Sequence, residues 1–350
     1  MRTSAATGLS PGLAESGAAT ASGRIRPFRA EDIPDVVALR RRAYRYSERP
    51  DSASLEAYCE RIFCRRDNAD DDLPSLVHED AHGRLTGFLG VIPHRMVFRA
   101  EGVRLAVATQ MMVAPEARGI AGLGLVRAFF AGPQDVSLSD TANDAARRLW
   151  EGLGGYTSTI HSLTWRLPLR RRGLPAWASP RAVRVPPPGS VEPLDPAAVA
   201  AEAPRLLRHF ALKPAYPTGD LAWLLRRAAE KPSGVLRGGM VRDHRGEVAG
   251  WFLYYLRPGR TSHVLHVAAR SSTERIVFGH LVHDAWRLDA TAVSGRLDPS
   301  IVAQVGVLDC EIRHDGPWTL LHARNPDLLD AVIEAKAFLS RLEGEWWLSF

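Results

Sequence analysis

The segment at 111–133, MMVAPEARGIAGLGLVRAFFAGP, joins a strand pattern to an apolar helix pattern that ends at a Gly-Pro pair. Gly119, Gly122 and Gly124 stand at the junction. A helix N-terminus carries unpaired backbone N–H groups and the positive end of the helix dipole, and glycine allows a phosphate to approach them closely. The segment therefore predicts an anion-binding turn. Tight packing of strand against helix is the alternative that the glycines alone leave open.

This turn matches neither of two common phosphate-binding motifs. No Gly-Lys-Ser/Thr follows it, which excludes a P-loop, and a meander of strands precedes it where the dinucleotide fingerprint needs a parallel βαβ unit. The other reactive side chains form no catalytic motif. The residues considered as a general base are His94, Glu101, Thr109 and Gln110, and each is interpreted as structural or solvated.

The residue types that bind metals are scattered along the chain. Cys59, Cys64 and Cys310 show neither a CxxC pair nor a Cys/His metal spacing, so we expect no metal site and a reducing, cytoplasmic compartment. His263 and His266, in SHVLHV, are expected on opposite faces of a strand. That placement argues against a metal shared by the two histidines.

Hydrophobic periodicity predicts the elements that position the turn. IRPFRAEDIPDVVALRRRAY predicts a strand and then a helix with Pro34 in its first turn. Period-2 patterns in SLVHED, RLTGFLGVI and MVFRAEGVRLAVATQMMV predict antiparallel strands, with turns at residues 82–83 and near residues 101–102. DVSLSD predicts another strand, and TANDAARRLWEGLGGY predicts a helix with a capping box of Thr141 and Asp144. The order is βα, a meander, then βαβα.

The second half of the chain repeats part of this pattern. HGRLTGFLG at 82–90 has the glycine spacing of RGEVAGWFL at 245–253. The continuation SHVLHVAARSSTERIVFGHLVHDAW again predicts a strand and a helix, but Ser271, Ser272 and Thr273 stand where the first half has glycines. We therefore expect the anion-binding turn in the first half alone.

The totals indicate a globular protein with excess positive charge. A chain of 350 residues suits two domains, its 45% hydrophobic and 24% charged residues are typical of globular proteins, and it has no apolar run long enough for a membrane span. The net charge of +6 favours anionic partners without choosing among phosphorylated cofactors, nucleic acid and membrane surfaces. RLPLRRRGLPAWASPRAVRVPPPGSVEPLDP, between the halves, is interpreted as an extended linker, with a nucleic-acid patch as the alternative.

Three blocks of the sequence resemble the GNAT superfamily of acyl-CoA-dependent N-acyltransferases. IRPFRAEDIPDVVALRRRAY resembles its opening strand and helix, MMVAPEARGIAGLGL its strand and pyrophosphate loop, and NDAARRLWEGLGGY its later helix. The likeness covers residues 25–165. The family loop is written Gln/Arg-x-x-Gly-x-Gly/Ala, and counted from Arg118 the glycines Gly122 and Gly124 come one residue late.

The resemblance implies acetyl-CoA or another acyl-CoA as co-substrate, and a small-molecule, sugar-like or amino-acid-like amine as acceptor. The cofactor-binding residues that it implies are Met112, Val113, Arg118, Gly119, Ile120, Ala121, Gly122, Leu123, Gly124 and Asn143. In the family, the loop matched by residues 118–124 holds the pyrophosphate through backbone N–H groups. Met112 and Val113 would pair with the pantetheine arm as an added strand, and Asn143 stands where the family often contacts that arm.

The resemblance also bears on catalysis. Many GNAT enzymes have a tyrosine that protonates the leaving thiolate at the position of Trp150, whose indole N–H cannot act as an acid at neutral pH. Tyr156 is the substitute candidate, with a packing role as the alternative. The chain is thus interpreted as an N-acetyltransferase, and the alternatives are a non-catalytic acyl-CoA sensor and a Fem-type aminoacyl transferase.

We therefore expect an α/β (α+β) protein of two GNAT-like domains, each a mixed, mainly antiparallel sheet flanked by helices. The expected parts are a disordered tail at 1–23, an acyl-CoA-binding domain at 24–166, a Pro/Arg-rich linker at 167–195 and a degenerate second domain at 196–350. A cleft between the two halves is the expected acceptor site. We expect no membrane partner and no nucleic-acid partner, and the oligomeric state stays open.

Overall fold

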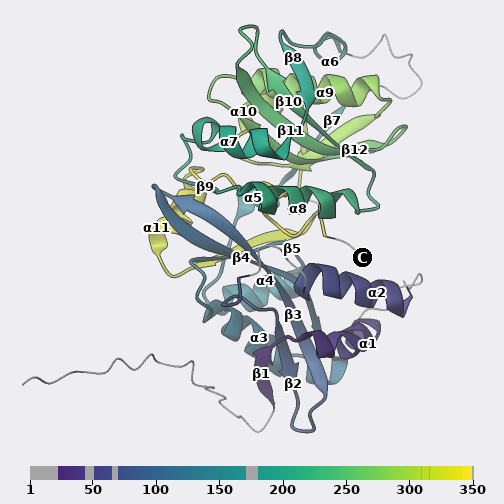
Figure 1. Ribbon diagram of the computed structural model, residues 1–350, viewed down its shortest axis with the longest axis vertical. Coiled ribbons are helices and arrows are strands. Elements are labelled where there is room, and N and C mark those ends of the chain that lie inside the picture. The colour runs from purple at the N-terminus through teal and green to yellow at the C-terminus, as the bar shows by residue number, and fades with distance from the viewer. Residues whose placement is uncertain are drawn as a thin grey trace, which may run out of the picture.

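The computed structural model describes residues 23–43, 51–64, 70–170, 180–308, 310–314 and 316–348, which build two sheets that follow each other along the long axis of the molecule (Figure 1). The expected tail lies outside these ranges except for Gly23, as does the part of the expected linker at 171–179. The first sheet has the order β1 (Arg24–Pro27), β2 (Leu76–Glu79), β3 (Leu85–Phe98), β4 (Glu101–Val113), β5 (Val136–Ala142), β15 (Trp318–Ala323) and β6 (Tyr156–Thr157), and β9 (Leu212–Pro214) pairs with β3.

The second sheet has the order β14 (Glu311–Arg313), β7 (Thr164–Pro168), β13 (Ala292–Arg296), β12 (Thr261–Ala269), β11 (Val248–Leu256), β10 (Val235–Arg242) and β8 (Ser190–Pro193). Among the described strands, β4 pairs with β5 and β12 with β13 in parallel, and the other pairs are antiparallel. In both sheets a helix connects the parallel pair. The expected fold class, mainly antiparallel sheets flanked by helices, is confirmed.

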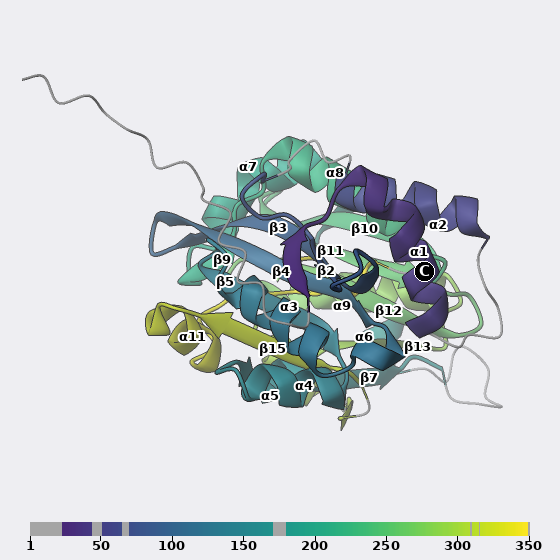
Figure 2. The ribbon, with the colours of Figure 1, turned by 90° about the horizontal axis from the view of Figure 1, so that it is seen from below.

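The helices cover the outer faces of the sheets and fill the space between them. They are α1 (Ile33–Ala43), α2 (Ser52–Cys59), α3 (Ile120–Phe130), α4 (Asp144–Glu151), α5 (Thr159–Ser162), α6 (Arg181–Arg184), α7 (Pro196–Leu206), α8 (Thr218–Ala229), α9 (Glu274–Arg287), α10 (Val302–Val307) and α11 (Pro326–Ile333). Short helical turns lie at η1 (Ala30–Asp32), η2 (Glu60–Cys64) and η3 (Pro115–Ala117). Helices α3 and α4 cover one face of the first sheet, and α1 and α2 the other (Figure 2).

One hydrophobic core joins the two sheets. It contains side chains of α1, α2, α7 and α8, of strands from both sheets, and of the C-terminal segment at 337–348. Phe338, Leu342 and Trp347 of that segment are each at most 3% exposed. Helix α8 lies between the sheets (Figure 1). The C-terminal segment is therefore a structural part of both halves, because its burial removes apolar surface of each from water.

The two halves also exchange strands. β7 follows the last elements of the first half in the sequence, yet it pairs with β13 and β14 of the second sheet. β15 comes from the end of the chain and is inserted between β5 and β6 of the first sheet. Each sheet thus depends on hydrogen bonds from a strand of the other half of the chain.

The repeat detected in the sequence falls on two hairpins with the same turn. Between β2 and β3, Asp80 Oδ1 accepts hydrogen bonds from the backbone of His82 and Arg84, and Gly83 has φ +78°. Between β10 and β11, Asp243 Oδ1 accepts from residues 245 and 247, and the glycine at 246 has φ +77°. A left-handed φ favours glycine at both places, and the element order that follows each hairpin is the same.

Two local expectations were wrong. The turn expected near residues 101–102 lies at Arg99 and Ala100, whose φ angles are 50° and 82°, because the two-residue connection between β3 and β4 needs positive φ at both central positions. The cap of α4 is Asn143, and the expected box of Thr141 and Asp144 does not form: Asn143 Oδ1 accepts the N–H of residue 146 at 2.9 Å.

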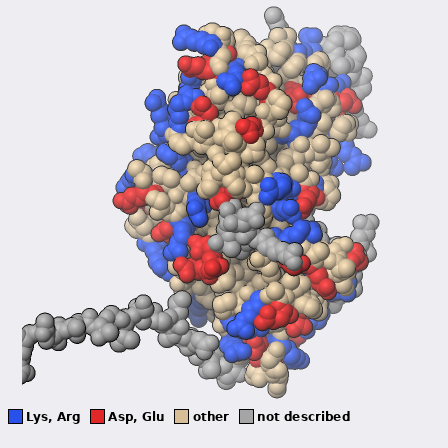
Figure 3. All heavy atoms as spheres, viewed as in Figure 1, with Lys and Arg blue, Asp and Glu red and all other residues tan. Residues whose placement is uncertain are grey.

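No helix of the described residues has the length and apolar character needed to cross a bilayer. On the face drawn in Figure 3, basic and acidic side chains are interspersed over both halves of the molecule. The excess positive charge of the sequence is therefore not gathered into one uniform patch on that face.

Candidate active site

The parallel strands β4 and β5 pair between the middle of β4 and the beginning of β5, and then diverge. Their register covers Leu105–Val136, Ala106–Ser137 and Val107–Leu138. Beyond these pairs β4 continues beside β3, and β5 continues beside β15. A cavity of about 960 Å³ fills the opening, and it is lined by residues 108–113 of β4 and by Ser139, Thr141 and Ala142 of β5. We call this cavity the β4–β5 cleft. It exposes a free strand edge of β4, which an extended ligand can pair with.

The N-terminus of α3 opens into the β4–β5 cleft. Gly119, with φ +97°, precedes the helix and lets the chain turn out of the strand direction. The first backbone bond at this end joins the N–H of Leu123 to the carbonyl of Gly119, so the N–H groups of residues 120–122 have no partner within the helix. Arg118, Gly119 and Gly122 line the cleft. These donors and the helix dipole favour an anion.

The helix begins earlier than the glycine pattern suggested. Gly122 and Gly124 lie inside α3 and not in a loop before it. A Cβ atom at Gly122 would lie 3.3 Å from Met111 Cε, so this glycine lets α3 approach β4 closely at the wall of the cleft. A Cβ atom at Gly124 would contact Ile25 of β1 at 3.5 Å, away from the cleft. The two glycines therefore serve different neighbours.

The structure places the residues that the resemblance implied as follows. Those that line the β4–β5 cleft are Met112, Val113, Arg118, Gly119, Gly122 and Asn143. Those of α3 that do not line it are Ile120, Ala121, Leu123 and Gly124. Tyr156 lies on β6, pairs with Leu321 of β15 and packs against the main core, outside the wall of the cleft. The binding and catalytic roles of all these residues stay predictions.

A β-bulge interrupts β4 within the cleft. The register jumps from Phe88–Met112 to Gly90–Thr109, and Gln110 has φ +51°. Gln110 is held by two helices: its Oε1 accepts from Arg40 of α1 at 3.1 Å, and its Nε2 donates to Tyr58 Oη of α2 at 2.9 Å. A bulge interrupts the ladder of backbone hydrogen bonds, and here it lies on the cleft wall, which Gln110 and Met111 both line.

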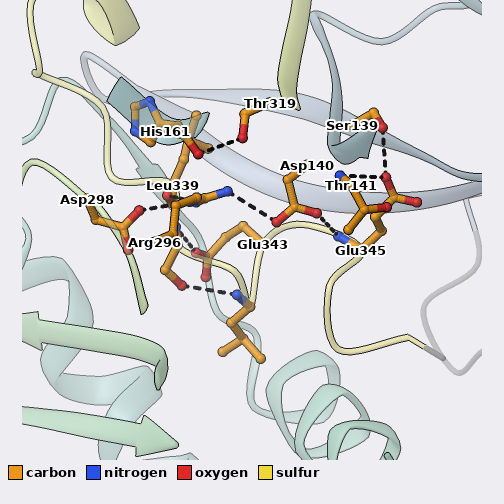
Figure 4. A network of polar contacts seen from close by, with 12 residues as sticks. Ser139, Asp140, Thr141, His161, Arg296, Asp298, Thr319, Leu339, Glu343 and Glu345 are labelled. Carbon is orange, nitrogen blue, oxygen red and sulfur yellow. Dashed lines mark hydrogen bonds and ion pairs between the residues drawn. The ribbon is translucent and has the colours of Figure 1, made fainter. Parts of the chain in front are cut away.

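The carboxylate of Glu345 lies where β4 and β5 part, although sequence reasoning did not select it. Its Oε1 accepts from Ser139 Oγ at 2.7 Å and from the N–H of Thr141 at 3.2 Å (Figure 4). Burial, with help from the charge of Asp140, raises the pKa of Glu345 to about 7, although hydrogen bonds from Ser139, Thr109 and Thr141 oppose the rise. A carboxylate with this pKa can exchange protons near neutral pH.

A buried ion-pair network holds Glu345 in place. Its backbone N–H donates to Asp140 Oδ1 at 2.7 Å, and Asp140 Oδ2 accepts from Arg296 of β13 at 3.1 Å (Figure 4). Arg296 also pairs with Asp298 at 3.0 Å and donates to the carbonyl of Leu339. The second sheet, through Arg296, therefore helps to hold the Glu345 carboxylate beside β5 of the first sheet. No local sequence pattern could have revealed this arrangement.

Lys231, which follows α8, is a second cleft residue that the sequence did not indicate. Its Nζ donates to the backbone carbonyls of Trp346 and Leu348 and lies 4.2 Å from the centroid of the Trp346 ring. Burial, followed by the charge of Arg341, lowers its pKa to about 8. The ammonium thus helps to hold the C-terminal segment on the cleft wall.

At the corresponding helix of the second half, α9, the residue before the helix carries a side chain where the first half has Gly119. Thr273 precedes α9, and its hydroxyl donates to the carbonyls of Ala249 and Arg270, both at 2.8 Å. The neighbouring Ser272 takes the left-handed conformation, with φ +75°, that glycine has in the first half. A side chain therefore fills the space beside this helix start.

The expectation that His263 and His266 lie on opposite faces was wrong. The register of β12 with β11 shifts beside Leu253 and Tyr254, so an extra residue reverses the alternation of side chains. The His263 ring lies near Trp346, with ring centroids 5.9 Å apart and planes tilted by 56°, and His266 Nδ1 is 2.6 Å from Ser340 Oγ. Both histidines thus face the C-terminal segment. Among the described residues no group of three or more His, Cys, Asp or Glu side chains is arranged to hold a metal.

Comparison with known proteins extends the fold assignment. No family model and no curated protein matches the sequence. A probable N-acyltransferase of unknown function from Enterococcus faecalis V583 superposes with a TM-score of 0.58 at 13% identity, covering 86% of this chain and 72% of the other. A GCN5-related N-acetyltransferase from Kribbella flavida gives 0.55 at 15%, covering 85% and 70%. Another from Anabaena variabilis ATCC 29413 gives 0.57 at 14%, covering 86% and 73%.

The chain has the GNAT fold. The superpositions extend over both sheets, because more than four fifths of the chain is covered in each comparison. The resemblance noted in the sequence is thus confirmed at the level of the fold. At this identity the GNAT fold does not assign a donor or an acceptor, since one fold can carry several functions.

Proposed function

We propose that the chain transfers an acyl group, with acetyl as the simplest case, from acyl-CoA to an amine acceptor. The observation that carries the proposal is the β4–β5 cleft, which combines a helix N-terminus at Gly119, a free strand edge and the buried carboxylate of Glu345. Its volume of about 960 Å³ is at the upper end of the range of about 300–1,000 Å³ for ligand sites. The fold shared with N-acyltransferases supports the same assignment.

The donor would bind along β4. The pyrophosphate would accept hydrogen bonds from the free N–H groups of residues 120–122, with Arg118 beside it. The pantetheine arm carries amide groups and can pair with the free edge at Met112 and Val113 as an added strand. This direction brings the thioester toward the bulge at Gln110, where β4 and β5 part.

The reaction would be a direct transfer. The neutral amine attacks the thioester carbonyl, so that a C–N bond forms and the C–S bond then breaks to release CoA as its thiolate. Glu345 accepts the proton that the attacking nitrogen loses and passes it to solvent. The backbone N–H of Gln110, at the bulge, would polarise the carbonyl as its oxygen gains negative charge. A thiolate can leave without an acid, but more slowly than with one, which accommodates Trp150 at the tyrosine position.

A thiol-release assay over an amine panel tests this proposal. The purified chain, given acetyl-CoA, should release CoA only when an amine is present, and mass spectrometry should show the amine gaining one acetyl group. Tight acetyl-CoA binding without turnover on any amine would favour the non-catalytic sensor instead. Turnover with an aminoacyl-tRNA donor and none with acetyl-CoA would favour the Fem-type alternative.

A further inference from the structure

A second cavity, of about 260 Å³, lies beside the β4–β5 cleft on the side of the second sheet. We call it the Arg341 cavity, after the buried arginine in its wall; the charged and aromatic residues that carry the argument are Arg166, His263, Glu311, Arg313, Arg341 and Trp346. Trp346 lines both cavities, and the next residue toward the N-terminus is Glu345 of the cleft. The two spaces are therefore adjacent at the C-terminal segment.

The wall of the Arg341 cavity carries more positive than negative charge. It contains three arginines and one carboxylate, that of Glu311. Glu311 is already shared, because Arg166 lies 3.5 Å and Arg313 2.7 Å from its oxygens. Burial lowers the pKa of His263 to about 4, and the nearby charges of Arg341, Arg257 and Lys231 add to this effect. The His263 ring is therefore neutral and can donate one hydrogen bond. The formal charge of the wall is thus about +2 by counting side chains.

Arg341 is a buried cation that no carboxylate of the described residues contacts directly. Arg341 is 8% exposed. Within the described part of the chain its guanidinium forms neither a hydrogen bond nor an ion pair. Its close contact is the ring of Trp346, whose centroid lies 4.4 Å from Arg341 Cζ. Asp140 and Asp298, whose charges reach Arg341, are bonded to Arg296 instead. Burial lowers the pKa of Arg341 to about 10. An unpaired buried charge is costly, and a bound anion removes that cost.

The arrangement of the two cavities suggests what brings the anion. Trp346 packs against Lys231, which lines the cleft, and against Arg341, which lines the second cavity. A molecule whose amine lies beside Glu345 can therefore extend past Trp346 and place another group near Arg341. The volume of about 260 Å³ suits a carboxylate or phosphate with some water, since one water takes up about 30 Å³.

We propose that the Arg341 cavity is the subsite for an anionic group, a carboxylate or a phosphate, on the amine acceptor. The proposal rests on the proposed function, because it assumes that an amine is acylated in the cleft. Arg341 would be the principal partner of the anion, with Arg166 and Arg313 at its rim. The same charge distribution disfavours acceptors that carry several amines and no anionic group, because their extra ammonium groups would meet these arginines.

Calorimetric titration of the full chain with inorganic phosphate tests the anion site independently of turnover. The titration is done in saturating CoA, so that the start of α3 is already occupied. Wild-type protein should bind phosphate, and Arg341→Gln should weaken binding by about 10- to 100-fold, the loss expected for one or two charge-assisted hydrogen bonds. Arg275→Gln, which removes the same charge from the exposed outer side of α9, is the matched control and should bind as wild type does.

The kinetic part of the experiment tests the link to the acceptor. Phosphate should raise the KM of an amino-carboxylate or amino-phosphate acceptor, and leave the KM of acetyl-CoA unchanged. Arg341→Gln should raise the acceptor KM by about 10- to 100-fold with little change in kcat, whereas a matched amine without the anionic group should react equally in both proteins. Arg313→Gln at the rim, expected to raise the same KM less, serves if Arg341→Gln does not fold.

The outcomes separate the two proposals. Absence of phosphate binding, or binding that is equally tight in Arg341→Gln, would overturn the anion site even if amines are acetylated. Phosphate binding that depends on Arg341 but does not compete with the acceptor would overturn the acceptor assignment. Absence of acetylation with every amine, together with Arg341-dependent phosphate binding, would overturn the proposed function and the acceptor assignment but not the anion site.

Discussion

Replacing Glu345 by glutamine removes the proton acceptor at the base of the β4–β5 cleft and keeps its shape. The glutamine oxygen can still accept the hydrogen bonds of Ser139 Oγ and the Thr141 N–H. In the wild type these two donors lie 2.7 and 3.2 Å from the Glu345 carboxylate. With a pKa of about 7 for Glu345, the ionised fraction rises from about 10% at pH 6 to about 90% at pH 8. The kcat of the wild type should follow this rise. In Glu345→Gln it should fall by about 10²- to 10⁴-fold and lose the limb near pH 7.

The assay is a pH profile of CoA release at saturating acetyl-CoA and acceptor. Glu343→Gln is the matched control, because burial also raises the pKa of Glu343 to about 7 but its carboxylate is bonded to Tyr216 and to the N–H of Ser340, away from the cleft wall. This control should keep the limb near pH 7. A Glu345→Gln enzyme that retains kcat within about threefold, with the limb of the wild type, would refute the assignment of the base.

Three further predictions concern the cleft and the buried charges. Gly122→Val places a branched side chain against Met111 at the cleft wall and should weaken acetyl-CoA binding at least about tenfold by calorimetry, whereas Gly124→Val, which meets Ile25, should weaken it less. Equal losses would contradict the different placement of the two glycines. Trp150→Tyr supplies a phenol that can protonate the thiolate, so kcat should rise at unchanged acetyl-CoA affinity; an unchanged kcat would show that no acid is missing. The pKa values of Glu343 and Glu345 are raised from 4.5 to about 7, so their contribution to stability is full below the unfolded value and is lost as the pH rises through 7. Denaturant unfolding should therefore show that the free energy of unfolding of the wild type, taken relative to Glu345→Gln, decreases between pH 5 and 8 by at most about 3 kcal/mol; a relative free energy that increases would contradict the buried, protonated state.

The strands and helices of the first half could be predicted because their signals are local. The period of 2 in the residues of β3 and β4, the period of 3.6 in α3, and the Asp-x-x-Gly turns at 80–83 and 243–246 are each determined within about a dozen residues. The resemblance to the GNAT superfamily depends on the same local blocks. The fold class was therefore accessible from the sequence.

The features that the sequence did not reveal depend on contacts between distant residues. The insertion of β15 between β5 and β6 pairs Leu321 with Leu138 and Tyr156, far apart in the chain. Glu345 accepts a hydrogen bond from Ser139, which lies 206 positions away in the sequence. The bulges in β4 and β12 shift the side-chain alternation by one residue, which a strict period of 2 does not anticipate. The proposed general base and the faces of the two histidines therefore became apparent only in the folded chain.

A crystal structure of the chain with CoA tests the central claim most directly. The account predicts one CoA per chain, with its pyrophosphate within hydrogen-bond distance of the N–H groups of residues 120–122, its arm beside Met112 and Val113, and its sulfur near Glu345 at the base of the β4–β5 cleft. Electron density for CoA at the start of α9, or at both helix starts, would contradict the account, as would a chain that binds no CoA at concentrations that saturate GNAT enzymes.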